Sequence, residues 1–440
     1  MKISVFGTGY VGLVTGVCFA EIGHEVVCID KDKKKIEKLK KGKTTIHEAG
    51  IDKKIKNGIV SGKLTFSSDF REIKEYDAIF ICVGTPDDGE GKSNLTYLND
   101  VVSEICENIE IDTQIFIKST VPVGTCLEIQ TKINKFLSKK NKKIKVTVSS
   151  NPEFLSEGNA INDFMKPDRI IIGTEDQDAF SLGQEIYKSF HRSNYRIIKM
   201  SQNSAEMTKY ASNTFLATKI SFMNQLSHLC DLKGVDIDSV RSGMALDPRI
   251  GKHFLYAGCG FGGSCFPKDL NSLISQSQDD SFNFSILEEV IKINTYQKKF
   301  LVKKIFENLK NVKNSIVTVW GISFKPETDD IRESPALTTI NSLLEAGAKI
   351  HIYDPIALKN AKELYKNKKA ISYFDNSYQA AVGADAVVLC TEWKEFNNLN
   401  CEELLKIMKG NLFFDGRNLY DPIIMSKVGF NYFSVGRNNV

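Results

Sequence analysis

The chain has 440 residues, more than a single hydrophobic core ordinarily holds, so we expect two or three domains. Its net charge of +4 is small for this length and its lysines are scattered, which gives no indication of a nucleic-acid partner. No apolar run reaches membrane length, and the chain enters a strand directly after Met1, so we expect a cytoplasmic protein without a membrane partner.

Ten cysteines are present, and none forms a C-x-x-C pair. Several fall within apolar strand or helix patterns, which is typical of reduced thiols in a cytosol. We therefore expect neither disulfides nor a metal site.

The first predicted strand, Lys2 to Phe6, leads directly into Gly7-Thr8-Gly9-Tyr10-Val11-Gly12 and an apolar helix. This is the dinucleotide-binding fingerprint in the strand-to-helix context that it requires. Gly7 permits a tight turn, Gly9 lets the backbone approach a pyrophosphate, and Gly12 lets helix and strand pack closely.

The next predicted strand, Glu25 to Ile29, ends in Asp30, at the distance from the fingerprint where an acid accepts the ribose hydroxyls. Lysines at 31, 33, 34 and 35 would suit a 2′-phosphate, but an acid at the strand tip repels one. The sequence therefore predicts NAD rather than NADP as the cofactor.

Further strands are predicted at 78–83, 114–118 and 144–149, separated by helical patterns, which indicates a doubly wound sheet. Ligands bind beyond the carboxyl ends of such strands. The segments there are Gly84 to Pro86, Ser119 to Pro122, and Asn151 to Glu157. Capping would explain Thr120 or Glu157 alone, whereas three polar segments at one crevice favour a binding site.

A long helix is predicted from Ser201 to Lys233, with apolar residues on nearly every face and Gly234 at its end. Such a helix is expected to be buried on all sides, crossing between domains and packing on its twin in a homodimer. Lys209 and Asn213 share one face. An ammonium among apolar neighbours either binds a polar group or extends to solvent.

Residues Gly260 to Asp269 bring Cys265 to the start of a helix through a glycine-rich turn. Pro267 suits the first helical position, which places Cys265 near the N-cap among unpaired amide donors. A helix N-terminus and a nearby lysine, here Lys268, lower the pKa of a cysteine and favour the thiolate. A packed core cysteine is the alternative, but three glycines leave room for a ligand.

The last part of the chain repeats the α/β pattern, with strands predicted at 314–320, 348–353, 386–390 and 412–415. Its first strand runs into Gly321 to Lys325, which lacks the dinucleotide fingerprint. A second dinucleotide is therefore not expected, but a nucleotide bound through other phosphate contacts stays possible. Basic residues that could make such contacts follow the strand ends: Lys325, Arg332 and Arg417.

Taken together, these motifs resemble the UDP-glucose 6-dehydrogenase family from end to end. The resemblance rests on Gly7 to Gly12, Ser119 to Thr125, Asn151 to Leu155, Lys209 with Asn213, Gly260 to Asp269, and Gly321 to Lys325. It implies two Rossmann-like domains, 1–200 for NAD and 311–440 for the UDP-sugar, joined by a helical dimerisation and catalytic domain at 201–310.

The resemblance also implies a four-electron oxidation, in which two NAD⁺ in succession convert the C6 alcohol of the sugar to a carboxylate. Cys265 would attack the C6 aldehyde, the thiohemiacetal would lose hydride, and water would cleave the thioester. Lys209 and Asn213 would steady the oxyanion, and Glu153 would act as acid or base. Thr120 and Asp269 would hold the water that takes up protons.

Two binding sets follow from the same resemblance. The NAD set is Gly7, Gly9, Tyr10, Val11, Gly12, Asp30, Lys35, Thr85, Thr120, Glu157, Lys268 and Arg332. The UDP-sugar set is Glu153, Phe154, Leu155, Ser156, Glu157, Lys209, Asn213, Phe254, Leu255, Tyr256, Ala257, Gly258, Gly262, Phe324, Lys325 and Arg417, with Arg249 from the partner subunit. Position 35 is a lysine in this chain, whereas some relatives have an arginine there.

Three alternatives stay open. Sister enzymes that act on GDP-mannose or on UDP-N-acetylated sugars share the architecture and a comparable thiol. A two-electron β-hydroxy-acid dehydrogenase would share the first domain without needing Cys265 or the last domain. A non-catalytic NAD-dependent sensor would need none of the proposed catalytic residues.

Overall fold

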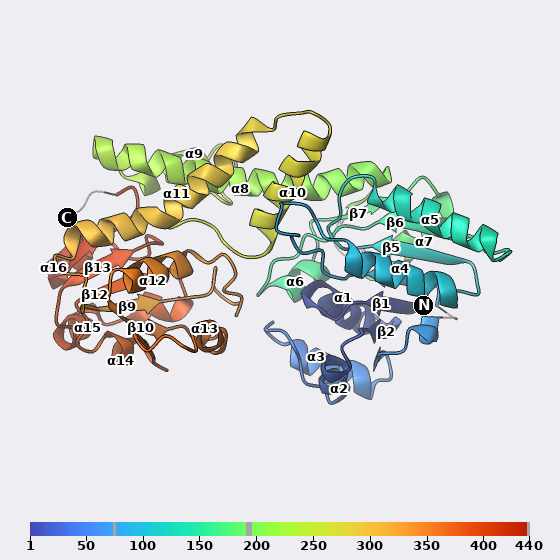
Figure 1. Ribbon diagram of the computed structural model, residues 1–440, viewed down its shortest axis with the longest axis horizontal. Coiled ribbons are helices and arrows are strands. Elements are labelled where there is room, and N and C mark those ends of the chain that lie inside the picture. The colour runs from blue at the N-terminus through green and yellow to red at the C-terminus, as the bar shows by residue number, and fades with distance from the viewer. Residues whose placement is uncertain (74–75, 191–195, 438–440) are drawn as a thin grey trace. The chain divides into compact units, whose positions relative to one another are not determined.

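The computed structural model describes residues 1–73, 76–190 and 196–437 (Figure 1). The chain divides into two compact units. The first unit comprises Met1–Ser212 with Asn271–Asp280, and the second comprises Asn213–Leu270 with Ser281–Val440.

The first unit is built on an eight-stranded sheet in the order β3-β2-β1-β4-β5-β6-β7-β8. All described pairs are parallel except β6 with β7. The strands are β1 Lys2–Phe6, β2 Glu25–Ile29, β3 Leu64–Ser67, β4 Ala78–Ile81, β5 Thr113–Ile117, β6 Val146–Ser150, β7 Arg169–Gly173 and β8 Arg196–Met200. The predicted doubly wound sheet is confirmed, and β3, β7 and β8 extend it beyond the predicted strands.

Both faces of this sheet are apolar because consecutive residues of a strand point to opposite sides. In β4, Phe80 packs with Phe19 of α1, whereas Ile79 and Ile81 join the cluster on the other face. The helices of this unit up to residue 190 are α1 Tyr10–Glu21, α2 Lys33–Lys40, α3 Ile51–Val60, α4 Thr96–Asn108, α5 Thr125–Lys139, α6 Ala160–Met165 and α7 Gln177–Ile186, with 3₁₀ turns at Phe70–Ile73 and Lys188–Phe190.

The middle of the chain is helical, with α8 Gln202–Lys233, α9 Ile237–Ala245, α10 Cys265–Asp279 and α11 Ser285–Asn308. In the single chain, Phe215 of α8 is 65% and Phe222 is 53% exposed, so burial of this helix on all sides requires the second copy of the chain and stays a prediction. The predicted start of α10 is corrected. The helix begins at Cys265, so Pro267 lies within its first turn, where amide donors have no intrahelical partner and proline is tolerated.

The second unit contains a fully parallel six-stranded sheet in the order β11-β10-β9-β12-β13-β14. Its strands are β9 Ile316–Trp320, β10 Lys349–Tyr353, β11 Ile371–Tyr373, β12 Ala386–Leu389, β13 Leu412–Asp415 and β14 Asn431–Phe433. Its helices are α12 Pro335–Glu345, α13 Leu358–Leu364, α14 Ser377–Ala381, α15 Cys401–Ile407 and α16 Pro422–Val428, with a 3₁₀ turn at Lys394–Asn398. The protein is therefore an α/β protein with two Rossmann-like sheets and a helical middle region.

Among the described residues, no helix combines the length and the apolar character needed to cross a bilayer.

Candidate active site

The fingerprint loop follows β1 at the point where the strand order of the first sheet reverses, between β1 and β4. Gly7 has a φ of +91°, and a Cβ at Gly12 would lie 1.9 Å from the Gly7 carbonyl oxygen, so neither position accommodates another residue without strain. A Cβ at Gly9 would have no neighbour within 4 Å. The loop therefore leaves open space at the N-terminus of α1, where a pyrophosphate would bind.

Asp30 lies at the carboxyl end of β2 and is held by the fingerprint loop. One carboxylate oxygen accepts hydrogen bonds from the Thr8 amide at 2.8 Å and the Thr8 hydroxyl at 2.7 Å. Burial acts to raise the pKa of Asp30, but hydrogen bonds from Asp32 and Thr8 and the Lys35 charge outweigh it and lower the pKa. The carboxylate is thus ionised and fits the ribose hydroxyls of NAD, and Lys35 lies 3.6 Å away as a counter-ion.

We expect Asp30→Asn to reduce the preference for NAD⁺ over NADP⁺ by about tenfold, because the substitution removes the charge that repels a 2′-phosphate. The amide that replaces the carboxylate keeps the size of the side chain and can still accept a hydrogen bond from Thr8. The measurement is the ratio of kcat/KM for the two cofactors. A wild-type enzyme that already favours NADP⁺ would contradict this role of Asp30.

The segments after β4 and β5 are joined to each other. The Thr85 hydroxyl donates to the Thr120 carbonyl at 2.7 Å, and the Ser119 hydroxyl donates to the Val83 carbonyl at 2.7 Å. The segment after β6 begins at Asn151, whose backbone amide donates to the Ile117 carbonyl at 2.8 Å. Three segments that the sequence placed at strand ends are therefore adjacent in the first unit.

Glu153 and Lys209 form a buried ion pair within the first unit. The Lys209 ammonium lies 2.9 Å from Glu153 Oε1, and Lys209 and Glu153 are 4% and 8% exposed. The Leu155 amide donates to Glu153 Oε2 at 2.6 Å. Burial alone would raise the pKa of Glu153, but the Lys209 charge and these hydrogen bonds lower it. Of the two possibilities left open for Lys209, the polar partner is confirmed over extension to solvent.

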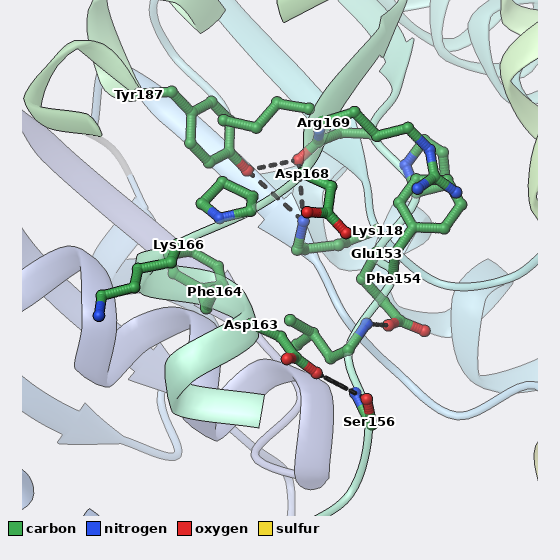
Figure 2. Close-up of a pocket in the computed structure, with 15 residues that line it drawn as sticks. Lys118, Glu153, Phe154, Ser156, Asp163, Phe164, Lys166, Asp168, Arg169 and Tyr187 are labelled. Carbon is green, nitrogen blue, oxygen red and sulfur yellow. Dashed lines mark hydrogen bonds between the residues drawn. The ribbon is translucent and has the colours of Figure 1, made fainter. Parts of the chain in front are cut away.

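A cavity of about 200 Å³ lies beside Glu153, and Figure 2 shows the residues that line it. They come from the residue after β5, the segment between β6 and β7, the first two residues of β7, and the residue after α7. Three of its charged or polar residues were not singled out from the sequence: Lys118, Arg169 and Tyr187. The Arg169 guanidinium stacks on Phe154 at 3.9 Å from the ring centroid. Lys118 closes an apolar strand just before Ser119, and this was the available sequence signal.

In the second unit, Cys265 is exposed and is the first residue of α10. The preceding loop is fixed by close backbone contacts. The Gly263 amide donates to the Arg332 carbonyl at 2.8 Å, and a Cβ at Gly262 would lie 2.4 Å from the Glu333 carbonyl oxygen. A glycine is required at 262, and the loop presents the thiol at the helix start.

Asp269 connects two other predicted site residues within the second unit. Asn213 Nδ2 donates to one Asp269 carboxylate oxygen at 2.6 Å, and the Lys268 ammonium lies 2.6 Å from the other. Asp269 is 1% exposed, so both oxygens of a buried carboxylate are paired. These predicted residues of the second unit thus form one cluster at the first turn of α10.

Arg417 follows β13 and is held by backbone carbonyls. Its guanidinium donates to Cys390 at 2.8 Å, to Phe324 at 3.2 Å and to Gly260 at 3.5 Å. A Cβ at Gly258 would lie 3.4 Å from Arg417 Nη1. Two segments predicted to bind the sugar nucleotide, 254–258 and 321–325, therefore both lie beside Arg417.

The other predicted residues are placed as follows. Arg249 and Arg332 are exposed and pair with Asp247 at 2.6 Å and Asp330 at 2.7 Å. Phe254 has a φ of +62°, an uncommon conformation for a side chain of this size. Leu255 and Ala257 are buried, Tyr256 is 62% exposed, and Lys325 lies over the Phe324 ring.

The remaining predicted residues lie in the first unit. Tyr10 donates to Glu48 and accepts from the Gly158 amide at 2.6 Å. Ser156 pairs with Asp163 at 2.7 Å, and Val11 and Glu157 are half-buried.

Residues 1–191 match the NAD binding domain of the UDP-glucose/GDP-mannose dehydrogenase family, 203–296 its central domain and 318–422 its UDP binding domain. A UDP-glucose 6-dehydrogenase of Pseudomonas aeruginosa is 40% identical over 99% of this chain and 98% of its own length. A UDP-glucose dehydrogenase structure from Pyrobaculum islandicum matches at 34% identity and a TM-score of 0.90, covering 99% of this chain and 98% of its own. A UDP-D-ManNAc dehydrogenase from Pyrococcus horikoshii matches at 28% identity and a TM-score of 0.87, covering 100% of both chains. The chain therefore belongs to the UDP-glucose/GDP-mannose dehydrogenase family and is an NAD-dependent dehydrogenase.

Proposed function

We propose that the protein oxidises UDP-glucose at C6 to UDP-glucuronate, consuming two NAD⁺ and one water. The observation that carries the proposal is the exposed thiol of Cys265 at the start of α10, in a chain that also has an NAD binding and a UDP binding domain. A two-electron dehydrogenase needs no nucleophile, whereas conversion of an aldehyde to an acid through a covalent adduct does.

Bound NAD⁺ supplies the hydride acceptor for each of the two oxidations. After the first, Cys265 Sγ attacks the C6 aldehyde and forms a thiohemiacetal, and loss of hydride from that adduct leaves a thioester. Lys209 and Asn213 donate hydrogen bonds to the oxyanion that develops. Glu153 exchanges the proton, and Thr120 and Asp269 hold the water that takes up protons. Water then cleaves the thioester, which frees the carboxylate product and the thiol.

The assignment keeps the three domains expected from the sequence, which are an NAD-binding domain at 1–200, a dimerisation and catalytic domain at 201–310 and a UDP-sugar-binding domain at 311–440. Some residues of each set come from the other domains. Support comes from the open space at Gly9 and the ionised Asp30 for NAD, and from the carbonyl-held Arg417 for the UDP-sugar. Lys268 and Arg332 complete the NAD set, and Phe324 and Lys325 complete the UDP-sugar set. We place the enzyme in the cytoplasm.

The test is the number of NADH formed per sugar consumed, measured by absorbance with purified protein and limiting UDP-glucose. Two NADH per sugar supports the proposal. One would indicate a two-electron dehydrogenase, and none a sensor. The same assay with UDP-N-acetylglucosamine, UDP-N-acetylmannosamine and GDP-mannose identifies the sugar.

A second candidate is the same chemistry on a UDP-N-acetylated hexosamine. The observation in its favour is the high TM-score with the dehydrogenase from Pyrococcus horikoshii, which shows that one fold accommodates such a substrate. The higher sequence identity with UDP-glucose dehydrogenases favours UDP-glucose. A higher kcat/KM for the acetylated sugar in the panel would reverse this choice.

The protein also forms a homodimer in this proposal, through the exposed apolar face of α8. A groove of about 280 Å³ runs between α8 and α11, lined by Phe222, Ile286, Val290 and Ile293 among others. Ile286 is 62% exposed and Leu232 is 82% exposed. An exposed apolar patch of this kind favours a second copy of the chain, and Arg249 then acts in the partner's site.

We expect light scattering to report a dimer at micromolar concentration, and Phe222→Asp to shift the protein towards monomer because a buried unpaired charge is costly. Ile423→Asp is the matched control. Ile423 is a similarly exposed apolar residue, at 57%, but it lies on α16 and does not line the groove. An active wild-type monomer would rule out both the dimer and the trans role of Arg249.

A further inference from the structure

Lys118 is a buried cation in the first unit that the proposed chemistry does not use. It is 4% exposed, follows β5 directly, and lines the same cavity as Glu153 (Figure 2). Its ammonium donates to Asn151 Oδ1 at 3.2 Å and lies 3.5 Å from the Tyr187 hydroxyl. Both partners are neutral, so neither hydrogen bond pairs the ammonium with a negative charge.

Asn151 links Lys118 to the segment that carries Glu153. Besides Lys118, its Oδ1 accepts from the Tyr187 hydroxyl at 2.7 Å, and its Nδ2 donates to the Ile171 carbonyl at 2.8 Å. Only Pro152 separates Asn151 from Glu153. A side chain fixed at all three points holds the backbone of this segment, which places Glu153 relative to Lys209.

We propose that Lys118 is a positioning residue for the acid–base step, acting on Glu153 through its buried positive charge and through its hydrogen bond to Asn151. This inference rests on the proposed function, because it assumes that Glu153 exchanges a proton with the substrate. Both side chains are buried, and at a buried site a cation near a carboxylate favours the ionised form. Lys118 thereby adds to the effect of Lys209.

The charged and titratable groups around this pair are consistent with that role. Glu153 faces Lys209 of α8 and Lys118 after β5, and both lower its pKa against the effect of burial. Lys118 faces the Cys82 thiol after β4, Glu153 and Lys209, and burial lowers its own pKa to about 8. Tyr187 stays protonated because burial raises its pKa. Arg169 stacks on Phe154, while the exposed Lys166 and Asp168 also line the cavity.

The experiment compares the pH dependence of kcat/KM for UDP-glucose in four forms of the full chain: wild type, Lys118→Met, Lys118→Gln and Lys118→Arg. Loss of the charge raises the pKa of Glu153, so we expect the acidic limb to move to higher pH by about half to one pH unit in the Met and Gln variants. Lys118→Arg keeps the positive charge, so we expect the acidic limb of its pH profile to stay at the wild-type position. Gln retains a donor for Asn151 if the Met variant does not fold.

Lys166→Met is the matched control, because it removes an exposed positive charge from the lining of the same cavity and is expected to leave the limb in place. An unchanged limb in every folded Met or Gln variant would overturn the inference, as would the same shift in Lys118→Arg. A wild-type protein that forms no NADH with any sugar of the panel would instead refute the proposed function, so the two failures are distinguishable.

Discussion

The Cys265→Ala variant is expected to lose turnover of UDP-glucose and to form no covalent adduct with the sugar. Cys265 is the exposed thiol at the first residue of α10, a position that an incoming aldehyde can reach. Without it the aldehyde has no nucleophile and cannot proceed through the second oxidation. Removal of a covalent nucleophile commonly costs several orders of magnitude in kcat, so we expect a loss of about 10³-fold or more.

The Cys265→Ser variant gives a sharper readout of the same step. An alkoxide leaves less readily than a thiolate, so an ester between the sugar and the serine can accumulate. Intact-protein mass spectrometry after incubation with NAD⁺ and UDP-glucose would detect it. Both variants should bind NADH with near-normal affinity, because the fingerprint at Gly7 to Gly12 belongs to the other unit.

Cys401→Ala is the matched control for these variants, since Cys401 is a free, partly buried thiol on α15 with no proposed role. It is expected to keep full turnover. If Cys265→Ala still produced two NADH per sugar, the thiohemiacetal mechanism would be wrong, and Cys265 would have no more than a structural role.

The second large effect is expected for Lys209→Met, which removes the cation that contacts the buried Glu153 carboxylate at 2.9 Å. Removing one partner of a buried ion pair costs about 3–5 kcal/mol, because the remaining charge stays desolvated. The double variant Lys209→Met with Glu153→Gln is expected to recover much of this loss. Urea unfolding of the two single variants and the double variant measures the coupling.

Lys188→Met is the matched control for this loss of stability. Lys188 pairs with Glu185 at 3.3 Å, but both side chains are more than half exposed, so we expect no measurable change. Equal loss of stability in Lys209→Met and in the double variant would mean that packing, and not the unpaired charge, explains the cost.

The pH dependence of this stabilisation has a defined sign. The pKa of Glu153 is lower in the folded protein than its ordinary value of about 4.3. The pair therefore contributes its full stability above the unfolded pKa, and the contribution is lost as pH falls through the folded pKa. The difference in stability between wild type and Lys209→Met should accordingly be constant near neutral pH and shrink in acid.

Much of the site was predictable from the sequence because its signals are local. The fingerprint needs glycine at fixed positions, since Gly7 has positive φ and Gly12 contacts the backbone of Gly7, and Asp30 follows from the length of one βαβ step. The strands β1, β2 and β13 were predicted with their observed bounds, because each is an apolar run ended by a glycine or an acid. Cys265 was identified from its glycine-rich turn.

Other features depend on contacts between residues far apart in the chain, and no local pattern contains them. Strands β3, β11 and β14 form edges of their sheets and are only three or four residues long, so each pairs because a neighbouring strand is present. Strand β7 has an apolar run of its own, Ile170 to Ile172, which sequence reasoning missed. The loop before α10 is likewise held by the backbone at Arg332 and Glu333, which lie far along the chain.

The charge state of the site was likewise decided by tertiary structure. The sequence by itself determined that Lys209 lies on an apolar helix, where it either binds a polar group or extends to solvent. Glu153 is 56 positions away, and only the fold brings the two together. Lys118, Asn151 and Tyr187 come from three different elements, and their interaction could not be read from any one of them. The pKa of a buried group depends on the charges around it in space, so only the folded chain establishes which of these groups are ionised.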